Sequence, residues 1–351
     1  MLSDQKGADV LKPTASPPTR IGALDFTKGA LVLFMVLYHW LNYFVAPQGD
    51  IYRYLRFLTP SFIFITGFLI SNVYLRRYQV TDWRLPMRLI RRGLKLLGVF
   101  VCLNVGISLL LADSYNGEIL FGRLSLRDIA AIYLTGNVWV AANAKAAAFY
   151  ILVPISYLLL LSALLLIACR FCKYIFHVVC AFFLLSILVL ALNGIQSANL
   201  ELLTVGLLGV ISGYAPLEKI NDCVNHPYAL IFAYLCYIGV ITLWNVTYPL
   251  QLVGVYLTLI LIYKLGARSG IPGKVRKHVI LLGKYSLFGY IAQIAILQLL
   301  HRGLRHINLG AGTLGLTLFV ALALTIASVV LVDRLRTKTV SVDWLYKAVF
   351  A

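Results

Sequence analysis

The sequence predicts an all-α integral membrane protein, with about ten transmembrane helices in one bundle and both termini in the cytoplasm. Three observations predict this class. Of the 351 residues, 61% are hydrophobic and only 13% are charged, which is about half the charged share of an average soluble domain. The mean hydropathy is +0.87. Apolar stretches of about 20 residues, the length that crosses a bilayer, recur along the chain.

Each of these stretches is a candidate transmembrane helix. We expect spans at 23–45, 55–75, 93–112, 146–168, 174–193, 199–216, 228–245, 249–265, 280–300 and 310–332. The stretch 125–142 is also apolar, but it is short and is interrupted by Gly136 and Asn137. We interpret it as a surface or re-entrant helix.

The basic residues predict the orientation of the chain. The 31 Lys and Arg residues outnumber the 13 Asp and Glu residues, which gives a formal charge of +18. Most of them fall in short loops between spans, as expected of cytoplasmic loops, and no nucleic-acid-binding motif accompanies them. We therefore expect a multi-pass protein of the cell (inner) membrane, surrounded by the lipid bilayer, with no nucleic acid as a partner.

The chain divides into one domain and two tails. Residues 1–19 are polar and rich in proline, which predicts a disordered cytoplasmic tail, and they lack the layout of a cleaved signal peptide. Residues 20–333 form the transmembrane domain, and 334–351 form a short cytoplasmic C-terminal tail. Cys169 and Cys172 make a CxxC pair, but no second pair completes a metal set, so we expect no metal.

His39 is the first candidate for chemistry, because it lies deep in the span 23–45, eleven residues after Lys28. Eleven steps of about 100° return a helix almost to its starting direction, with a rise of roughly 16 Å. The two side chains therefore share a face. A titratable group inside a membrane normally faces a polar cavity. The structural alternatives are a His39 bonded to a neighbouring helix, a Lys28 that only reaches the interface and an Asp25 that only pairs with Lys28.

Several motifs in the first hundred residues carry a family resemblance. Leu24-Asp25-Phe26-Thr27-Lys28-Gly29 precedes His39, Phe62-Ile63-Phe64-Ile65-Thr66-Gly67-Phe68-Leu69-Ile70 forms part of the second span, and Arg88-Leu89-Ile90-Arg91-Arg92-Gly93-Leu94-Lys95 leads into the third. These motifs resemble those of the acyltransferase-3 family of transmembrane acyltransferases. Phe149-Tyr150-Ile151-Leu152 and Gly283-Lys284-Tyr285-Ser286-Leu287-Phe288-Gly289-Tyr290 are similar to looser family patterns. The resemblance covers 20–97 most closely. In the late span, where relatives often have a histidine, this chain has Gln293.

The resemblance implies an enzyme, an acyltransferase. In this family an acyl group, often acetyl, moves from cytoplasmic acyl-CoA to a hydroxyl of an extracytoplasmic carbohydrate or glycolipid. It implies a catalytic group of His39, Lys28 and Asp25, with His39 as general base. It also implies contact of Thr66 and Gly67 with the coenzyme, and substrate contacts at Tyr150 and Tyr285. Glu201, close to the outer end of the sixth span, and the intramembrane Gln293 are further candidates for substrate contact.

The basic residues suit the donor on chemical grounds. Arg88, Arg91, Arg92 and Lys95 are spaced i, i+3, i+4 and i+7, so they form one helical stripe that suits coenzyme phosphates. The pantetheine arm is then expected to follow the Lys28–His39 face inward. Alternatively, the stripe only sets the orientation of the chain and contacts anionic lipid. Thr66, Gly67 and Gln293 alternatively serve helix packing. Glu201 alternatively is only solvated.

Two other classes of function stay open from the sequence. One is a proton-coupled transporter or flippase of a polar or lipid-linked substrate, with His39 and Glu201 as a proton relay. The other is a scaffold or receptor, for which His39 would have no role in an activity.

Overall fold

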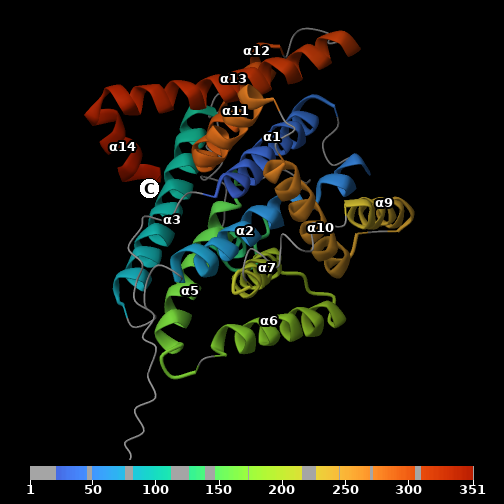
Figure 1. Ribbon diagram of the computed structural model, residues 1–351, viewed down its shortest axis with the longest axis vertical. Helices are drawn as coiled ribbons and strands as arrows, with labels where there is room; N and C mark the ends of the chain where they lie inside the picture. Colours follow the sequence, from blue (N-terminus) through green and yellow to red (C-terminus); the bar gives the residue numbers. More distant parts are fainter. Residues whose placement is uncertain are drawn as a thin grey trace, which may run out of the picture.

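The computed structural model describes residues 21–45, 50–75, 82–111, 126–138, 147–172, 174–215, 227–244, 246–268, 272–304 and 310–350. Within these ranges the chain is helical and contains no strand (Figure 1). The predicted N-terminal tail, 1–19, lies outside them. The helices are α1 (Gly22–Phe44), η1 (Asp50–Leu55), α2 (Leu58–Leu69), η2 (Ile70–Leu75), α3 (Arg84–Leu111), α4 (Leu126–Leu134), α5 (Leu152–Ala168), α6 (Ile175–Leu192), α7 (Ala198–Ser212), α9 (Pro227–Leu243), α10 (Tyr248–Ala267), α11 (Gly273–Lys284), α12 (Ser286–Gly303), α13 (Ala311–Lys338) and α14 (Val340–Phe350).

The lengths and composition of these helices indicate a membrane protein. Among the described residues, five helical segments are long and apolar enough to cross a bilayer, or six if the bent pair α11–α12 counts as one span. Three further helices, α5, α7 and α9, are apolar but shorter. The stretch interpreted as a surface or re-entrant helix contains α4, whose end residues Leu126 and Leu134 are exposed; its last residues lie outside the described part.

One expectation about continuity is wrong. The predicted span 280–300 is not one helix, because the chain bends by 94° between α11 and α12. The bend lies at Tyr285, whose hydroxyl donates to Asp333 on α13 over 2.6 Å, which anchors this point of the chain. In contrast, the expected helical stripe is confirmed, because α3 begins at Arg84 and contains all four of its basic residues.

The expected C-terminal tail is also helical. α13 continues to Lys338, and α14 then packs back along the bundle, with Lys347 accepting a hydrogen bond from Lys95 of α3 through its carbonyl (3.3 Å). Arg336 of α13 pairs with Asp343 of α14 over 2.5 Å. Hydrogen bonds from Lys347 and Arg336 hold the pKa of Asp343 below its ordinary value, so this link between α13 and α14 is lost only in acid.

Glycines allow the closest helix crossings. A Cβ placed on Gly283 of α11 would lie 1.7 Å from the carbonyl oxygen of Asp25, and one on Gly29 of α1 would lie 1.9 Å from that of Val279. The backbones of α1 and α11 therefore touch. Close approach through small residues is a main source of helix association in membranes, where lipid removes the hydrophobic driving force.

Glycines also allow close backbone contact between α2 and α7. A Cβ on Gly67 would lie 2.0 Å from the carbonyl oxygen of Gly206, and a Cβ on Gly209 would lie 2.2 Å from that of Phe64. The π-helical turn η2 then continues α2, and its Asn72 donates to the carbonyl oxygen of Gly213 at the end of α7 (3.2 Å). α2 and α7 therefore run parallel, with contacts along their whole length.

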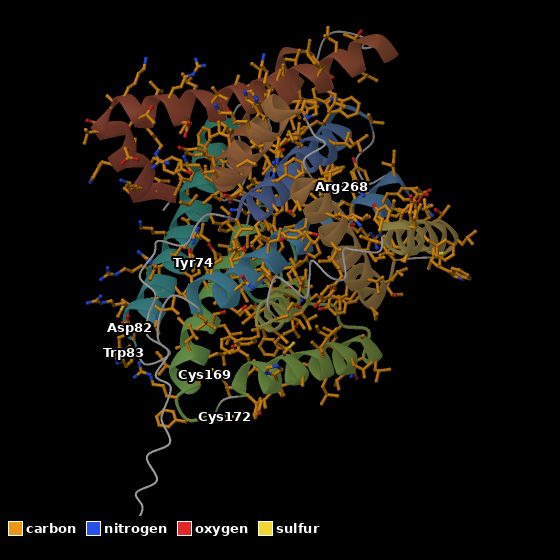
Figure 2. The ribbon with its side chains drawn as sticks, viewed as in Figure 1. Tyr74, Asp82, Trp83, Cys169, Cys172 and Arg268 are labelled. Carbon is orange, nitrogen blue, oxygen red and sulfur yellow. The ribbon has the colours of Figure 1, made fainter. Side chains whose placement is uncertain are left out.

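The helix ends gather into two groups, the first of which we name the Arg92 end. There Arg92 of α3 donates to the Tyr74 hydroxyl of η2 over 2.8 Å. Arg170, which follows α5, lies 4.8 Å from the centre of the Trp83 ring, which precedes α3; Trp83 and Cys169 are seen on the same side of the bundle in Figure 2. Three further contacts at this end are Asn72 with Gly213, His177 with Tyr214, and Phe26 with Gly266.

The second group is the Trp40 end. The Trp40 indole at the end of α1 donates to Thr317 near the start of α13 over 2.9 Å. Tyr248, which starts α10, donates to the carbonyl oxygen of Glu201 at the start of α7 over 3.0 Å. Further contacts here are Arg56 with Val246, Arg53 with Thr242, and Phe44 with His301.

The outermost helices are α6 and α13, which lie at opposite edges of the bundle with α1 and α2 between them (Figure 1). Both expose most of their apolar side chains. The buried core lies on the inner helices α1, α2, α5 and α7.

Gly283→Ala is expected to lower the free energy of unfolding by about 1–3 kcal/mol, because its methyl group meets backbone that cannot rotate away. Gly98→Ala on α3 is the matched control. A Cβ there has nothing within 4 Å, so this change should be neutral or stabilising. Thermal unfolding of both variants in detergent measures the difference. An equally stable Gly283→Ala would contradict the close α1–α11 crossing.

Candidate active site

α1 presents His39 to the interior near the Trp40 end. Its ring lies 5.2 Å from the Tyr38 ring, edge to face, and 6.3 Å from the Tyr290 ring of α12, centre to centre. The Nε2 atom is buried. Because the next residue, Trp40, turns about 100° further round the helix toward Thr317 of α13, His39 is left facing α12. The ring therefore points into the protein and not at lipid.

α12 contributes a second polar side chain, Gln293, one turn beyond Tyr290. Tyr290 and Gln293 both belong to the buried face of α12, and Gln293 has no exposed surface. Among the described residues, neither its Oε1 nor its Nε2 has a hydrogen-bond partner. An unsatisfied buried polar group costs about 1–3 kcal/mol. Gln293 is thus a buried amide whose hydrogen-bonding capacity is unused.

A strained residue packs against the same aromatic ring. Phe149 has a φ of 56°, the single non-glycine residue with positive φ in the described part of the chain. It is buried, and its ring lies 6.0 Å from that of Tyr290. A left-handed conformation at such a residue costs of order 1–3 kcal/mol and is found most often at functional sites. We call His39, Tyr38, Tyr290, Gln293 and Phe149 the His39 cluster.

At the other end of α1, Lys28 and Asp25 form an ion pair over 2.5 Å. Their side chains are only 20% and 13% exposed. The pairing that the sequence offered as the structural alternative is present. A catalytic role for either residue stays a prediction. What the structure shows is an ion pair within α1, at the Arg92 end and next to the α1–α11 crossing.

The face between Lys28 and His39 is closed. Val32 and Met35 lie on it, at i+4 and i+7 from Lys28, and both are buried, with 0% and 2% exposed surface. Val32 packs in a cluster with Leu282 and Val329. Apolar side chains therefore fill this face in the conformation described, and the route of a pantetheine arm along it stays a prediction.

The basic stripe of α3 lies on the surface. Arg88, Arg91, Arg92 and Lys95 are exposed, while α3 packs against α5 through Gly93 on its other side. Arg92 contacts Tyr74, and Lys95 contacts α14. The four residues share one face as predicted, but the structure does not bring that face to the His39 cluster. It presents them to solvent or head groups at the Arg92 end.

The remaining candidates lie in separate places. Gly67 faces the Gly206 backbone, and the Thr66 hydroxyl donates to the carbonyl oxygen of Phe62 over 2.8 Å within its own helix. Both observations match the helix-packing alternative. Tyr285 lies at the α11–α12 bend with Asp333 and is buried there.

Tyr150 and Glu201 lie near each other at the Trp40 end. The Tyr150 hydroxyl donates to Oδ1 of Asn199, two residues before Glu201. Asn199 in turn donates to the carbonyl oxygen of Tyr133 over 2.8 Å, which ties α4 to α7. Tyr150 follows Phe149 directly, so this polar link fixes the strained turn. A substrate contact at Tyr150 or Glu201 stays a prediction.

Three members of the cluster were not predicted as site residues from the sequence: Tyr38, Phe149 and Tyr290. Phe149 and Tyr290 lie within the motifs quoted above, but no role was assigned to them. Tyr290 and Gln293 are three residues apart and so share a helix face, and this spacing is a signal that could have found Tyr290. No sequence pattern marks the positive φ of Phe149.

The chain matches no protein-family model, and comparison with curated proteins and with solved structures finds no significant match. Among the described residues, no group of three or more His, Cys, Asp or Glu side chains is placed to hold a metal ion. Fold and site thus define an all-helical membrane protein with a buried histidine–aromatic–amide cluster.

A double-mutant cycle tests the Asp25–Lys28 pair. Asp25→Ala, Lys28→Ala and the double variant should give a coupling free energy of about 1 kcal/mol or more, because the pair is largely shielded from water. Asp50–Arg53 has the same spacing, but its Asp50 is 95% exposed, and it should give about 0.5 kcal/mol or less. Unfolding in detergent supplies both numbers. Equal coupling in the two pairs would show that burial adds nothing at Asp25.

Proposed function

We propose that this protein is an integral membrane O-acyltransferase. It takes an acyl group, with acetyl the first candidate, from cytoplasmic acyl-CoA and transfers it to a hydroxyl of an extracytoplasmic carbohydrate or glycolipid. The observation that carries the proposal is the interior position of His39 beside Tyr290. The motif resemblance around Asp25, Lys28 and His39 supports the same chemistry.

The membrane arrangement follows from the two groups of helix ends. We propose that the apolar part of α3 and the shorter helices α5, α7 and α9 cross the membrane together with the longer spans and the α11–α12 pair, giving ten spans. The Arg92 end then faces the cytoplasm, because it carries the stripe on α3 and the basic residues around Arg276 and Arg336. Both termini lie on that side, and the protein resides in the cell (inner) membrane.

The chemistry uses His39 as a general base. A neutral imidazole takes the proton of the acceptor hydroxyl as its oxygen attacks the thioester carbonyl carbon. The aromatic rings of Tyr38, Tyr290 and Phe149 exclude water from this point, which protects the thioester from hydrolysis. In this arrangement the Trp40 end faces outside, so the position of His39 near it supports an acceptor that arrives from that side.

The donor nucleotide is proposed to bind at the Arg92 end. Coenzyme A carries several phosphate charges and cannot enter lipid. The exposed guanidinium groups of Arg88 and Arg91 are suited to bidentate phosphate contacts. Because Val32 and Met35 fill the Lys28–His39 face, these side chains have to move before the pantetheine arm can reach His39.

A proton relay between His39 and Glu201 is not favoured by the contacts observed. Glu201 lies on α7 beside Tyr248, whereas the ring contacts of His39 run to Tyr38 and to Tyr290 on α12. A transporter is therefore kept as an outcome of the first test below.

His39→Gln is expected to lower the rate of acyl transfer from acetyl-CoA by about 10²–10⁴-fold, which is the usual worth of a general base, and to leave acetyl-CoA binding unchanged. The measurement is turnover of labelled acetyl-CoA by purified protein in liposomes. His278→Gln, at an exposed position on α11, is the control. Wild-type protein that neither binds nor consumes acetyl-CoA would favour the transporter.

Arg88→Gln with Arg91→Gln should raise the KM for acetyl-CoA by about tenfold or more, since each charge-assisted hydrogen bond is worth about 1.5–3 kcal/mol. The kcat should change little. Arg302→Gln, at an exposed position near the Trp40 end, is the matched control. If the double variant instead loses only its affinity for vesicles of anionic lipid, the stripe serves the lipid and not the coenzyme.

A further inference from the structure

The side-chain amide of Gln293 has no role in the reaction proposed above, and it has no hydrogen-bond partner among the described residues. An amide side chain offers two N–H donors and two acceptor lone pairs. In this protein all of them are buried and unpartnered within the described residues. Since buried polar groups in native proteins are nearly always satisfied, such an exception requires a reason. One such reason is a bound ligand that completes the hydrogen bonds.

Position singles out Gln293 among the buried unpartnered groups. The hydroxyls of Ser61, Ser162 and Thr258 are also buried without a partner, but they belong to α2, α5 and α10. Gln293 alone lies on the face of α12 that carries Tyr290, the ring in contact with His39. It is one helical turn from Tyr290 toward the Trp40 end.

The surroundings of Tyr290 show that this part of the fold is held in an unfavourable conformation. Phe149, with its positive φ, also packs against Tyr290. An unpaired amide and a strained backbone therefore flank one ring. Both features are expected where a site is organised for a ligand.

We propose that the Gln293 amide N–H donates to the carbonyl oxygen of the acyl group and so forms the oxyanion site of the reaction; this rests on the proposed acyltransferase function. His39 accepts the proton of the acceptor hydroxyl as its oxygen bonds to the carbonyl carbon, and the carbonyl electron pair moves onto the oxygen held by Gln293. The C–S bond then breaks, the ester is released, and the coenzyme sulfur leaves with the proton that His39 returns. Donors aimed at such an oxygen act mainly on kcat.

The experiment compares Gln293→Leu, Gln293→Asn and Gln298→Leu, with His39→Gln in parallel. Gln298, five residues further along α12, provides the matched control on the same helix. Gln293→Leu should lower the kcat for acetyl transfer by about 10²–10³-fold with a change in KM of less than about threefold. Its unfolding temperature should stay equal or rise, because the substitution removes an unsatisfied amide. Gln293→Asn keeps the amide N–H, but its side chain is shorter by one methylene, so the N–H lies farther from the acyl oxygen. Its kcat should therefore lie between those of the wild-type protein and Gln293→Leu.

The outcomes separate the two proposals. Loss of transfer in His39→Gln with full kcat in Gln293→Leu overturns the oxyanion site and leaves the acyltransferase standing. Full transfer in both variants overturns both. A fall in unfolding temperature that accompanies the loss of activity in Gln293→Leu assigns Gln293 to helix packing and overturns the inference as well. Loss of kcat in a protein of unchanged or higher stability supports it.

Discussion

The backbone contact between α1 and α11 is the constraint on which the candidate site depends. Gly29 and Gly283 let the two helices touch, and the 94° bend that follows at Tyr285 sends α12 off in a new direction. α12 then passes the part of α1 nearest the Trp40 end, where its Tyr290 meets His39. A side chain on either glycine would separate α1 from α11 and carry α12 away. The position of the His39 cluster therefore depends on two glycines without a Cβ, Gly29 and Gly283, near the Arg92 end.

A membrane interior makes the polar groups of this bundle informative. Most of the buried polar groups are satisfied by backbone, as in Asn104, which bonds to Ala148 in both directions, and Asn72, which bonds to Gly213. These residues join helices, as polar groups in membrane bundles commonly do. Gln293 has the same burial but joins nothing among the described residues. The contrast within one protein, and not burial by itself, marks Gln293 as a residue for a ligand.

Composition and apolar run length were enough to predict the helical class and most helix positions, because the bilayer length is a physical requirement on each span. Spacing also predicted the shared face of Arg88 and Arg91. The bend at Tyr285 was not predicted, because it depends on a hydrogen bond to Asp333, 48 residues away. α14 was missed because only one of its faces is apolar and it is too short to span. Tyr290 was missed as a partner of His39 because their contact is set by the crossing of helices that are distant in sequence.

The face of α1 between Lys28 and His39 is closed by the buried side chains of Val32 and Met35. Under the proposed function the thioester must be kept from water until an acceptor is present, and buried Val32 and Met35 provide that barrier. Met35 is the adaptable member, since its unbranched thioether has several rotamers, while Val32 is β-branched and stiff. Val32 packs near Gly289, Leu282 and Val329, next to the bend. Val32, the stiffer of the two side chains, is therefore held by residues on both sides of the bend, Leu282 on α11 and Gly289 on α12.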